Sequence, residues 1–237
     1  MTLRDIVALV VSYGYATGII ALAEVVRRWR GYPQDFTRKI VHIGAGMWVF
    51  GVLALFDNWY IGIIPFATFI GLNYLFYRYR VFSAMDAPDS TPGTVYFAFA
   101  ITVLFLLFWR TNSPSDQAAL AAAGTMAMTW GDAMAAIVGK RFGKHHYTIG
   151  TSTRSYEGSA AMFVACTIAM GLTLLLVPGS PLSPLGTPYG VGLSIGAALG
   201  AAAVATLAEA ASPSGTDNLS VPLLAGMTAY AIIAFAS

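Results

Sequence analysis

Long apolar runs separated by short polar segments dominate the sequence from end to end. Eight such runs lie at residues 6–26, 40–56, 59–77, 94–109, 117–138, 158–177, 189–208 and 219–236. A helix needs about 20 apolar residues to cross a hydrocarbon core of ~30 Å, and most of the runs approach that length. The pattern therefore predicts an all-α, polytopic integral membrane bundle of about eight transmembrane helices.

The runs also indicate how the helices are arranged. Only Asp57 and Asn58 separate the second run from the third, which predicts a tight helical hairpin there. Runs 117–138 and 189–208 are rich in Ala and Gly, and small residues let membrane helices approach closely, so we expect both at the centre of the bundle. The sequence shows no convincing internal repeat, which weakens an inverted-repeat transporter model. Residues 1–237 are interpreted as a single domain.

Composition supports a membrane protein and excludes other kinds of site. Hydrophobic residues make up 57% of the chain and charged residues 10%, against about 25% charged residues in soluble domains. The single cysteine, Cys166, excludes an intramolecular disulfide and a cysteine-based metal site. The net charge of +2 is too small to indicate nucleic-acid binding.

The basic residues are divided very unevenly between the two faces of the predicted bundle. Alternating the runs through a bilayer places four segments on one face: 27–39, 78–93, 139–157 and 209–218. That face holds eleven of the thirteen Lys and Arg residues, and the other keeps only Arg4 and Arg110. Cytoplasmic loops carry an excess of Lys and Arg, so the basic face is predicted to be cytoplasmic and both termini non-cytoplasmic. We expect a multi-pass plasma-membrane protein whose active site faces the cytoplasm and meets a soluble cosubstrate there.

A first polar motif, RKIVHIGAG, lies at the cytoplasmic start of the second run. Arg38, Lys39 and His42 share one face of a helix because they are three or four residues apart. Three cationic groups on one face suit an anion such as a phosphate chain. The alternative is a membrane anchor of positive charge with an interfacial histidine.

A second motif, WGDAMAAIVGKRFGKHH, places an acid inside the fifth run. Asp132 lies about two helical turns, roughly 10 Å, below Gly139 if the helix continues. An acid at that depth is costly and pairs with a cation or a metal, and Mg²⁺ prefers one or two carboxylates with phosphate oxygens and water. The alternative is a buried acid paired with Lys or Arg. Gly139 and Gly143 bracket Lys140, but the spacing of a Walker loop is absent.

Two further polar segments lie on the same face. In the segment TRSYEGS, Arg154 and neighbouring hydroxyl side chains precede the start of a helix. The backbone N–H groups of a helix start can bind a phosphate. The alternative is that Ser155 only caps the helix, with Glu157 in its first turn. The segment EAASPSGTDNL has two acids and no Lys or Arg, which indicates a cation site with Glu209, Asp217 and Asn218 as oxygen ligands. An exposed polar turn is the alternative. Basic groups, an embedded acid and an acidic segment on one face together predict a site for a metal–polyphosphate beside the lipid, as phosphoryl transfer requires.

These segments resemble the motif series of one enzyme family. RKIVHIGAG, GDAMAAIVGKRFGK, RSYEGS and a late Glu followed by DNLSVPL are similar, in order and approximate spacing, to motifs of the diacylglycerol/polyprenol kinase family, which includes dolichol kinases and phytol kinases. The similarity covers residues 24–224. It implies an all-helical membrane enzyme that phosphorylates a lipid alcohol, either an isoprenoid alcohol such as phytol, a prenol or a polyprenol, or diacylglycerol. It also implies CTP as the donor.

The resemblance and the motifs together assign roles to individual residues. Candidate catalytic residues are Asp132, Glu157 and His42, of which one accepts the proton of the lipid hydroxyl. Candidate nucleotide-binding residues are Arg38, Lys39, Gly139, Lys140, Gly143, Lys144, Arg154, Ser155, Gly158 and Ser159. Candidate Mg²⁺ ligands are Asp132, Asp217, Asn218 and Glu209. Arg154 stands where the family often has Lys, so a planar fork replaces a flexible point charge, and one Asp precedes Asn218 where the family often has two.

Three other functions stay open at this point. A cytidylyltransferase would use the same nucleotide on the same face but a lipid phosphate as nucleophile, forming a CDP-lipid. A transporter predicts ionisable groups near the bilayer midplane and access from both faces, whereas the outer face is nearly without charge. A non-catalytic scaffold leaves Asp132 without a role. The expected partners are CTP, a lipid alcohol and the bilayer, with no nucleic acid, and a homodimer is an oligomeric state that the sequence leaves open.

Overall fold

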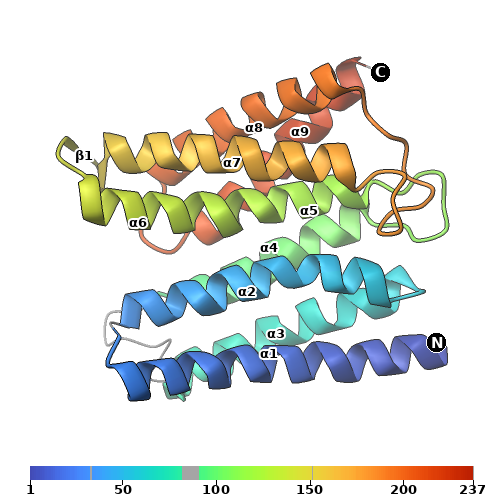
Figure 1. Ribbon diagram of the computed structural model, residues 1–237, viewed down its shortest axis with the longest axis horizontal. Helices are drawn as coiled ribbons and strands as arrows, with labels where there is room; N and C mark the ends of the chain where they lie inside the picture. Colours follow the sequence, from blue (N-terminus) through green and yellow to red (C-terminus); the bar gives the residue numbers. More distant parts are fainter. Residues whose placement is uncertain (33, 82–90, 151, 237) are drawn as a thin grey trace.

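In the computed structural model the chain is a bundle of long helices with one β-hairpin at one end (Figure 1). The structure describes residues 1–32, 34–81, 91–150 and 152–236. Within these residues the helices are α1 (Leu3–Arg30), α2 (Gln34–Leu55), α3 (Trp59–Tyr79), α4 (Gly93–Phe108), α5 (Ala118–Met126), the π-helix η1 (Ala127–Asp132), α6 (Ala133–Phe142), α7 (Tyr156–Leu176), α8 (Val191–Ala211) and α9 (Asp217–Ala236). The strands β1 (His146–Ile149) and β2 (Ser152–Ser155) pair in antiparallel fashion.

Six of the described helices are long and apolar enough to cross a membrane by length and composition: α1, α2, α3, α7, α8 and α9. Helix α4 is a shorter apolar helix. Helices α5, η1 and α6 follow one another without a break from residue 118 to residue 142. Each of the eight apolar runs of the sequence is therefore helical, and the number of eight membrane crossings stays a prediction.

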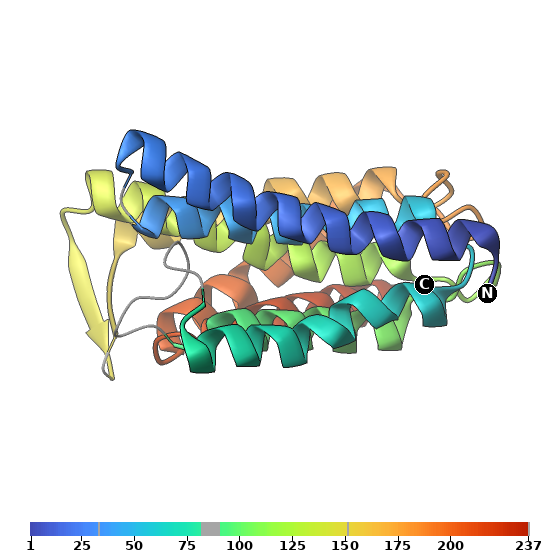
Figure 2. The same cartoon turned by 90° about the horizontal axis from the view of Figure 1, so that it is seen from below.

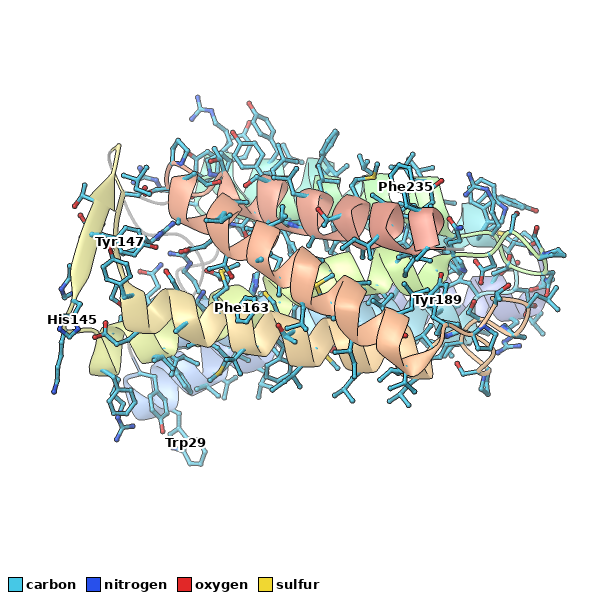
Figure 3. The ribbon with its side chains drawn as sticks, turned by 90° about the horizontal axis from the view of Figure 1, so that it is seen from above. Trp29, His145, Tyr147, Phe163, Tyr189 and Phe235 are labelled. Atoms are coloured by element: carbon cyan, nitrogen blue, oxygen red, sulfur yellow. The ribbon has the colours of Figure 1, made fainter. Side chains whose placement is uncertain are left out.

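The helices run side by side along one axis, and both termini lie at the end opposite the hairpin (Figures 1 and 2). Helices α1 and α2 pack together, α3 packs on α4, and α7, α8 and α9 pack in succession on the other side of the bundle. Helices α4 and α5 both contact α9 and thereby join the two sides. In Figure 3 Trp29, His145 and Tyr147 lie at the hairpin end, and Tyr189 and Phe235 lie toward the other end.

Small residues form the centre of the bundle at α5, as the sequence predicted for residues 117–138, and every residue of α5 is buried. The same prediction is wrong for residues 189–208, because α8 buries five alanines on one side and leaves Val191, Ile195, Leu199 and Leu207 exposed on the other. A methyl group added to Gly124 would lie 2.7 Å from the carbonyl oxygen of Pro222 and 3.0 Å from the Cα of Gly226. The backbones of α5 and α9 are therefore in direct contact, which only small residues permit.

The turn between α2 and α3 is held from the start of α1. The buried carboxylate of Asp5 accepts hydrogen bonds from the backbone N–H groups of Asp57 (3.1 Å) and Asn58 (3.2 Å). Thr2 and Asp5 also form a capping box on α1, and Arg4 pairs with Asp57 at 3.2 Å. The predicted tight turn at Asp57 and Asn58 is confirmed, and Asp5 satisfies the free amide groups of these two residues. The two helices do not pack on each other as a hairpin, because α2 packs mainly on α1 and α3 mainly on α4.

Two predictions about the basic face need correction. The segment 139–157 was expected as a loop, but it contains the last turn of α6, both strands and the start of α7, so the all-α prediction missed a β-hairpin. The segment 27–39 is mostly helical, because α1 continues to Arg30 and α2 begins at Gln34. Most of the predicted loop at 78–93 lies outside the described residues.

A candidate phosphoryl-transfer site between two cavities

Asp132 is the central acid of the site and lies well inside the helical bundle. Helix α6 continues for ten residues beyond it to Phe142, which places Asp132 about 15 Å from the helix end at 1.5 Å per residue. Asp132 is the last residue of η1, and single π-turns inside helices are frequent at functional sites. Its carboxylate accepts a hydrogen bond from Lys39 Nζ. The first and second sequence motifs therefore meet directly, across the contact between α2 and η1.

The packing of α2 on η1 fixes the other members of this cluster. His42 Nε2 lies 3.1 Å from the carbonyl oxygen of Met128 and 3.7 Å from Asp132 Oδ2, and its ring stacks on Phe97 at 4.9 Å. A methyl group on Gly46 would collide with the side chain of Thr129, so the last glycine of the first motif allows α2 to approach the π-turn.

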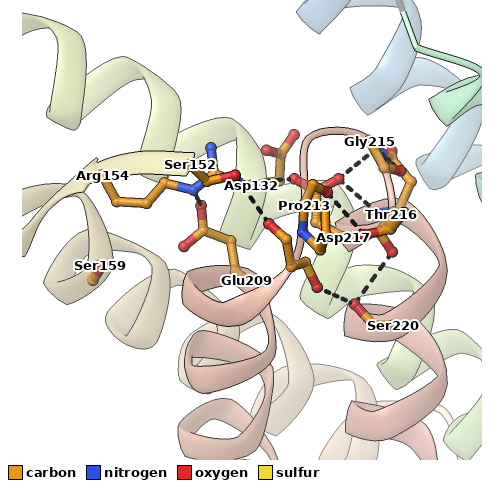
Figure 4. A network of polar contacts seen from close by, with 12 residues as sticks. Asp132, Ser152, Arg154, Ser159, Glu209, Pro213, Gly215, Thr216, Asp217 and Ser220 are labelled. Atoms are coloured by element: carbon orange, nitrogen blue, oxygen red, sulfur yellow. Dashed lines mark hydrogen bonds and ion pairs between the residues drawn. The ribbon is translucent and has the colours of Figure 1, made fainter. Parts of the chain in front are cut away.

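A second cluster forms around the guanidinium of Arg154, on strand β2 (Figure 4). Arg154 Nε lies 2.8 Å from Glu209 Oε1, and Nη2 lies 3.3 Å from Asp217 Oδ2. Glu209, near the end of α8, is 5% exposed, and Asp217, the first residue of α9, is 7% exposed. The alternative of an exposed polar turn is therefore wrong for both acids.

The acidic residues predicted as metal ligands gather around this second cluster. Asp132, Glu209 and Asp217 lie close enough together for their carboxylates to repel one another. Asn218 donates a hydrogen bond from its side-chain amide to Asp217 Oδ1 at 3.0 Å. Among the described residues no three His, Cys, Asp or Glu side chains come close enough to enclose a metal by themselves. The donor set nevertheless suits Mg²⁺, which takes one or two carboxylates and completes its shell with phosphate oxygens and water.

Two cavities open on either side of this polar centre. The larger has a volume of about 440 Å³ and includes Arg38, Lys39, His42, Asp217 and Asn218 in its wall. The smaller has a volume of about 370 Å³ and is enclosed by α6, the hairpin, the start of α7 and Glu209. Four residues line both cavities: Asp132, Ala136, Lys140 and Arg154. The acid and two cations of the predicted site therefore stand where the two cavities adjoin.

Glycines shape the smaller cavity. Ser155 caps α7 by accepting a hydrogen bond from the backbone N–H of Gly158 at 3.1 Å, so the capping alternative is correct for this hydroxyl. A methyl group on Gly139 or Gly158 would lie 3.1 Å from Ser155 Oγ, and one on Gly143 would collide with the carbonyl of Gly139. The three glycines let α6, β2 and α7 converge on Ser155. Ser159 also lines this cavity and contacts the hydroxyl of Tyr147 at 2.6 Å.

Two of the predicted residues are not among those that line the two cavities. Lys144 is exposed beyond the end of α6. Glu157 lies 2.7 Å from His145 Nδ1, a contact that ties the start of α7 to the residue before the hairpin. The remaining predicted residues all line one cavity or both, and these two do not.

The sequence pattern missed several residues that shape the site. His146 and Thr153 of the hairpin line the smaller cavity. Tyr15 and Phe97 line the larger one from α1 and α4. Tyr15 and Phe97 lie within apolar runs, where the sequence pattern does not distinguish a residue that lines a cavity from one that faces lipid.

Comparison with known proteins identifies the family of the chain. Residues 3–217 match the cytidylyltransferase family. The chain belongs to this family. A phytol kinase of Synechocystis sp. is 30% identical over 219 residues, which cover 92% of this chain and 88% of that protein. A probable chloroplastic phytol kinase of Triticum aestivum is 28% identical over 245 residues, covering 97% of this chain and 78% of that protein. No solved structure matches. The resemblance to the family of phytol and polyprenol kinases is confirmed.

Proposed function

We propose that the protein is a CTP-dependent kinase that phosphorylates the hydroxyl group of an isoprenoid alcohol, of the phytol class, at the cytoplasmic end of the bundle. The observation that carries this proposal is the position of Asp132, Lys140 and Arg154 in the walls of both cavities. A kinase for a lipid alcohol must hold a polar nucleotide and an apolar acceptor on two sides of one reacting centre. The similarity to phytol kinases supports this choice of acceptor.

The smaller cavity is the proposed site of the CTP triphosphate. Its wall combines Lys140 and Arg154 with the hydroxyls of Ser155 and Ser159 at the start of α7. A helix N-terminus favours anions through its free N–H groups and dipole, and charge-assisted hydrogen bonds from Lys and Arg are stronger than neutral ones. The glycines of this cavity leave the backbone accessible to a phosphate chain.

The larger cavity is the proposed site of the lipid alcohol. Its polar mouth is formed by residues such as Lys39, His42 and Asn218, and the remainder of its wall is largely apolar and aromatic. The hydroxyl of a lipid bound there would meet the terminal phosphate at the boundary shared by the two cavities. This arrangement provides the positioning on which phosphoryl transfer depends.

The proposed reaction is a direct transfer of the γ-phosphoryl group. The lipid hydroxyl oxygen forms a bond to the γ-phosphorus, the bond from that phosphorus to the bridging oxygen breaks, and the products are the lipid phosphate and CDP. Asp132 accepts the hydroxyl proton, while Lys140 and Arg154 stabilise the charge on the transferred group. Asp132 and Asp217, with Glu209 and Asn218, are the residues that would hold Mg²⁺, which supplies further charge neutralisation when it is bound.

The nearest alternative is a cytidylyltransferase that joins a lipid phosphate to CMP and releases pyrophosphate. The name of the matched family favours this reaction, whereas the names of the relatives that cover most of the chain favour a kinase. The two reactions place different atoms of CTP on the lipid, so one labelling experiment separates them.

The experiment uses purified protein in lipid vesicles with phytol, Mg²⁺ and CTP labelled at either the α- or the γ-phosphate. A kinase transfers the γ label to the lipid and leaves the α label in CDP. A cytidylyltransferase, given phytyl phosphate, transfers the α label and releases the γ label in pyrophosphate. Parallel reactions with ATP, GTP and UTP test the preference for CTP. Absence of γ label on any lipid alcohol with every donor would contradict the proposed function.

A further inference from the structure

The larger cavity reaches far beyond the polar site, into the apolar part of the bundle. Its apolar wall comes from α1, α2, α3 and α4, and on α2 and α4 the lining residues extend from the polar end of the helix toward its middle. On α2 they run from Arg38 to Trp48, and on α4 from Gly93 to Ile101. At 1.5 Å per residue these spans correspond to a depth of about 12 to 15 Å.

This depth is close to the thickness of one membrane leaflet. The hydrocarbon core of a bilayer is ~30 Å thick, so a single leaflet spans about 15 Å. A lipid tail that enters at the polar mouth can therefore extend for about the length of one leaflet before it reaches the end of the cavity. Phytol, whose main chain is about as long as the acyl chains of one leaflet, matches this depth, whereas a long polyprenol greatly exceeds it.

The indole of Trp48 stands at the deep end of the cavity and is held from several sides. It stacks on Tyr15 at 4.1 Å with an interplanar angle of 21°, and its Nε1 donates a hydrogen bond to Ser12 Oγ at 3.3 Å. A methyl group on Gly51 would lie 2.6 Å from the indole, so this glycine provides the space for the ring. Ser12 is in turn fixed by a hydrogen bond to the carbonyl of Ala8.

The bundle is closed beyond Trp48. Val49 and Val52 on α2 and Phe105 on α4 are fully buried. The ring of Phe105 packs against that of Phe66 at 5.0 Å, which joins α4 to α3 directly below the cavity. A tail that continues straight down the cavity would therefore meet the indole and the packed side chains beyond it.

We propose that Trp48 is the floor of the acceptor site and limits the length of the alcohol that the enzyme phosphorylates. This inference rests on the proposed function and specifies its substrate class: single-chain isoprenoid alcohols up to about the length of phytol, with long polyprenols excluded. Trp48 is a specificity-determining residue that contacts the tail end and takes no part in the transfer of phosphate.

The test is a competition between two acceptors in one reaction. Vesicles contain phytol and the long polyprenol solanesol in equal amounts, and the ratio of the two phosphorylated products is measured with γ-labelled CTP. A ratio taken within one reaction does not depend on the fraction of folded enzyme. The wild type should phosphorylate phytol almost exclusively. Trp48→Ala should raise the ratio of solanyl phosphate to phytyl phosphate by about tenfold or more, since cavity size at a tail end discriminates on this scale.

A second variant tests the same floor from the opposite direction. Ala16 lines the cavity on α1, one turn from Ser12 toward the mouth, and Ala16→Phe should shorten the space above Trp48. With farnesol and phytol as competitors, this variant should shift the products toward farnesyl phosphate by about tenfold. Trp59→Ala is the matched control, because Trp59 lies at the other end of the bundle under the guanidinium of Arg110 and should leave both ratios unchanged.

The outcomes separate this inference from the proposed function. If phytol is phosphorylated but neither Trp48→Ala nor Ala16→Phe changes its product ratio by more than about twofold, the floor is refuted and the kinase activity stands. A wild type that phosphorylates solanesol as readily as phytol refutes the floor in the same way. If no alcohol accepts the γ label, the proposed function fails and the inference fails with it.

Discussion

At the scale of single residues, the pairing of Asp132 with Lys39 is compatible with both hypotheses that the sequence offered for this acid. A buried acid that only neutralises a buried lysine is a structural pair, and its removal acts on stability. An acid at the boundary of two cavities, with a histidine 3.7 Å away, is also placed to accept a proton from a substrate. Asparagine, the isosteric amide, separates the two roles. It can replace Asp132 as a hydrogen-bond acceptor for Lys39, but it cannot replace Asp132 as a base.

We predict that Asp132→Asn abolishes turnover while the protein still folds. Asparagine keeps an oxygen that accepts the hydrogen bond from Lys39, but it cannot take up a proton from the lipid hydroxyl. The rate of γ-label transfer should fall by at least about a hundredfold, in the range that general base catalysis contributes. Melting temperature in detergent reports the fold. Glu24→Gln is the matched control, because Glu24 is an acid paired with Arg28 on α1 and should keep full activity. Retention of more than about a tenth of the wild-type rate in Asp132→Asn would refute the role as a base.

The acids around Arg154 lead to a prediction about the Mg²⁺ dependence of the reaction. If Asp217 helps to hold Mg²⁺ on the nucleotide, Asp217→Ala should raise the Mg²⁺ concentration needed for half-maximal rate, by about tenfold for the loss of one charged ligand. The KM for phytol should change much less, because the tail in the proposed site would lie among α1 to α4, whereas Asp217 lines only the polar part of that cavity. Asp57→Ala serves as control, since Asp57 lies at the opposite end of the bundle. Unchanged dependence on Mg²⁺ in Asp217→Ala would remove this residue from the metal site.

The sequence predicted which residue types gather at the site, but it did not predict how they pair. An acid inside an apolar run is costly to bury, so Asp132 was identifiable as a functional or paired residue from its position alone. The ion pairs of Arg154 with Glu209 and Asp217 join residues on β2, α8 and α9, and no local pattern reports such long-range contacts. Glu157 and Lys144 belong to the same motifs, yet neither lines the two cavities, so their predicted roles stay predictions.

At the scale of elements, the glycines of α6 and α7 decide how closely the walls of the smaller cavity approach. Gly158 meets the carbonyl oxygen of Ala135, so that a methyl group there would lie 3.0 Å from backbone. Because backbone cannot rotate away as a side chain can, a larger residue must push α7 away from α6. The predicted consequence is a change in nucleotide binding rather than in the lipid site.

We therefore predict that Gly158→Ala raises the KM for CTP by about tenfold and lowers the melting temperature, with little change in the KM for phytol. Gly196→Ala on α8 is the matched control, because nothing lies within 4 Å of the position that its methyl group would occupy. That control should be neutral or slightly stabilising, since alanine favours helix over glycine. Equal effects of the two substitutions on CTP binding would show that the close approach at Gly158 is unimportant.

The elements themselves were largely predictable, apart from the hairpin. Hydrophobic length alone located all eight runs, because a membrane-spanning helix has a strong and simple composition. The strands β1 and β2 each have four residues, most of them polar, and a pattern so short gives no alternation to recognise. The helices also extend beyond the apolar runs at the basic end, since charged residues there continue the helix into the interface.

At the scale of the whole molecule, the two ends of the bundle differ in chemistry. The hairpin end carries the site residues and nearly all of the basic residues, while the end with the termini has Arg4, Arg110 and structural acids such as Asp5. Both termini lie at the same end, as a chain of eight helical rods in the described residues requires. The positive-inside rule predicts that the hairpin end faces the cytoplasm, which is where the proposed donor CTP would be available.

The orientation is testable by labelling single cysteines with a membrane-impermeant maleimide. Cys166→Ala provides the background, because Cys166 is the only cysteine and is buried. Cysteines are then introduced at exposed positions of the two ends: Ile149 in β1 and Ser214 before α9, against Ser115 before α5 and Leu185 before α8. In intact cells the reagent should modify the cysteines at 115 and 185 and spare those at 149 and 214, and inverted vesicles should reverse the pattern.

Each outcome of the labelling has a definite meaning for the whole assembly. The same reagent on detergent-solubilised protein must reach all four positions, which controls for local burial. Modification of 149 and 214 in intact cells would reverse the orientation and place the proposed CTP site on the wrong side of the membrane. Modification of 149 together with 115 from one side would mean that the chain between them does not cross the bilayer. In that case α5, η1 and α6 would not form one transmembrane element, and Asp132 would not lie below a membrane surface.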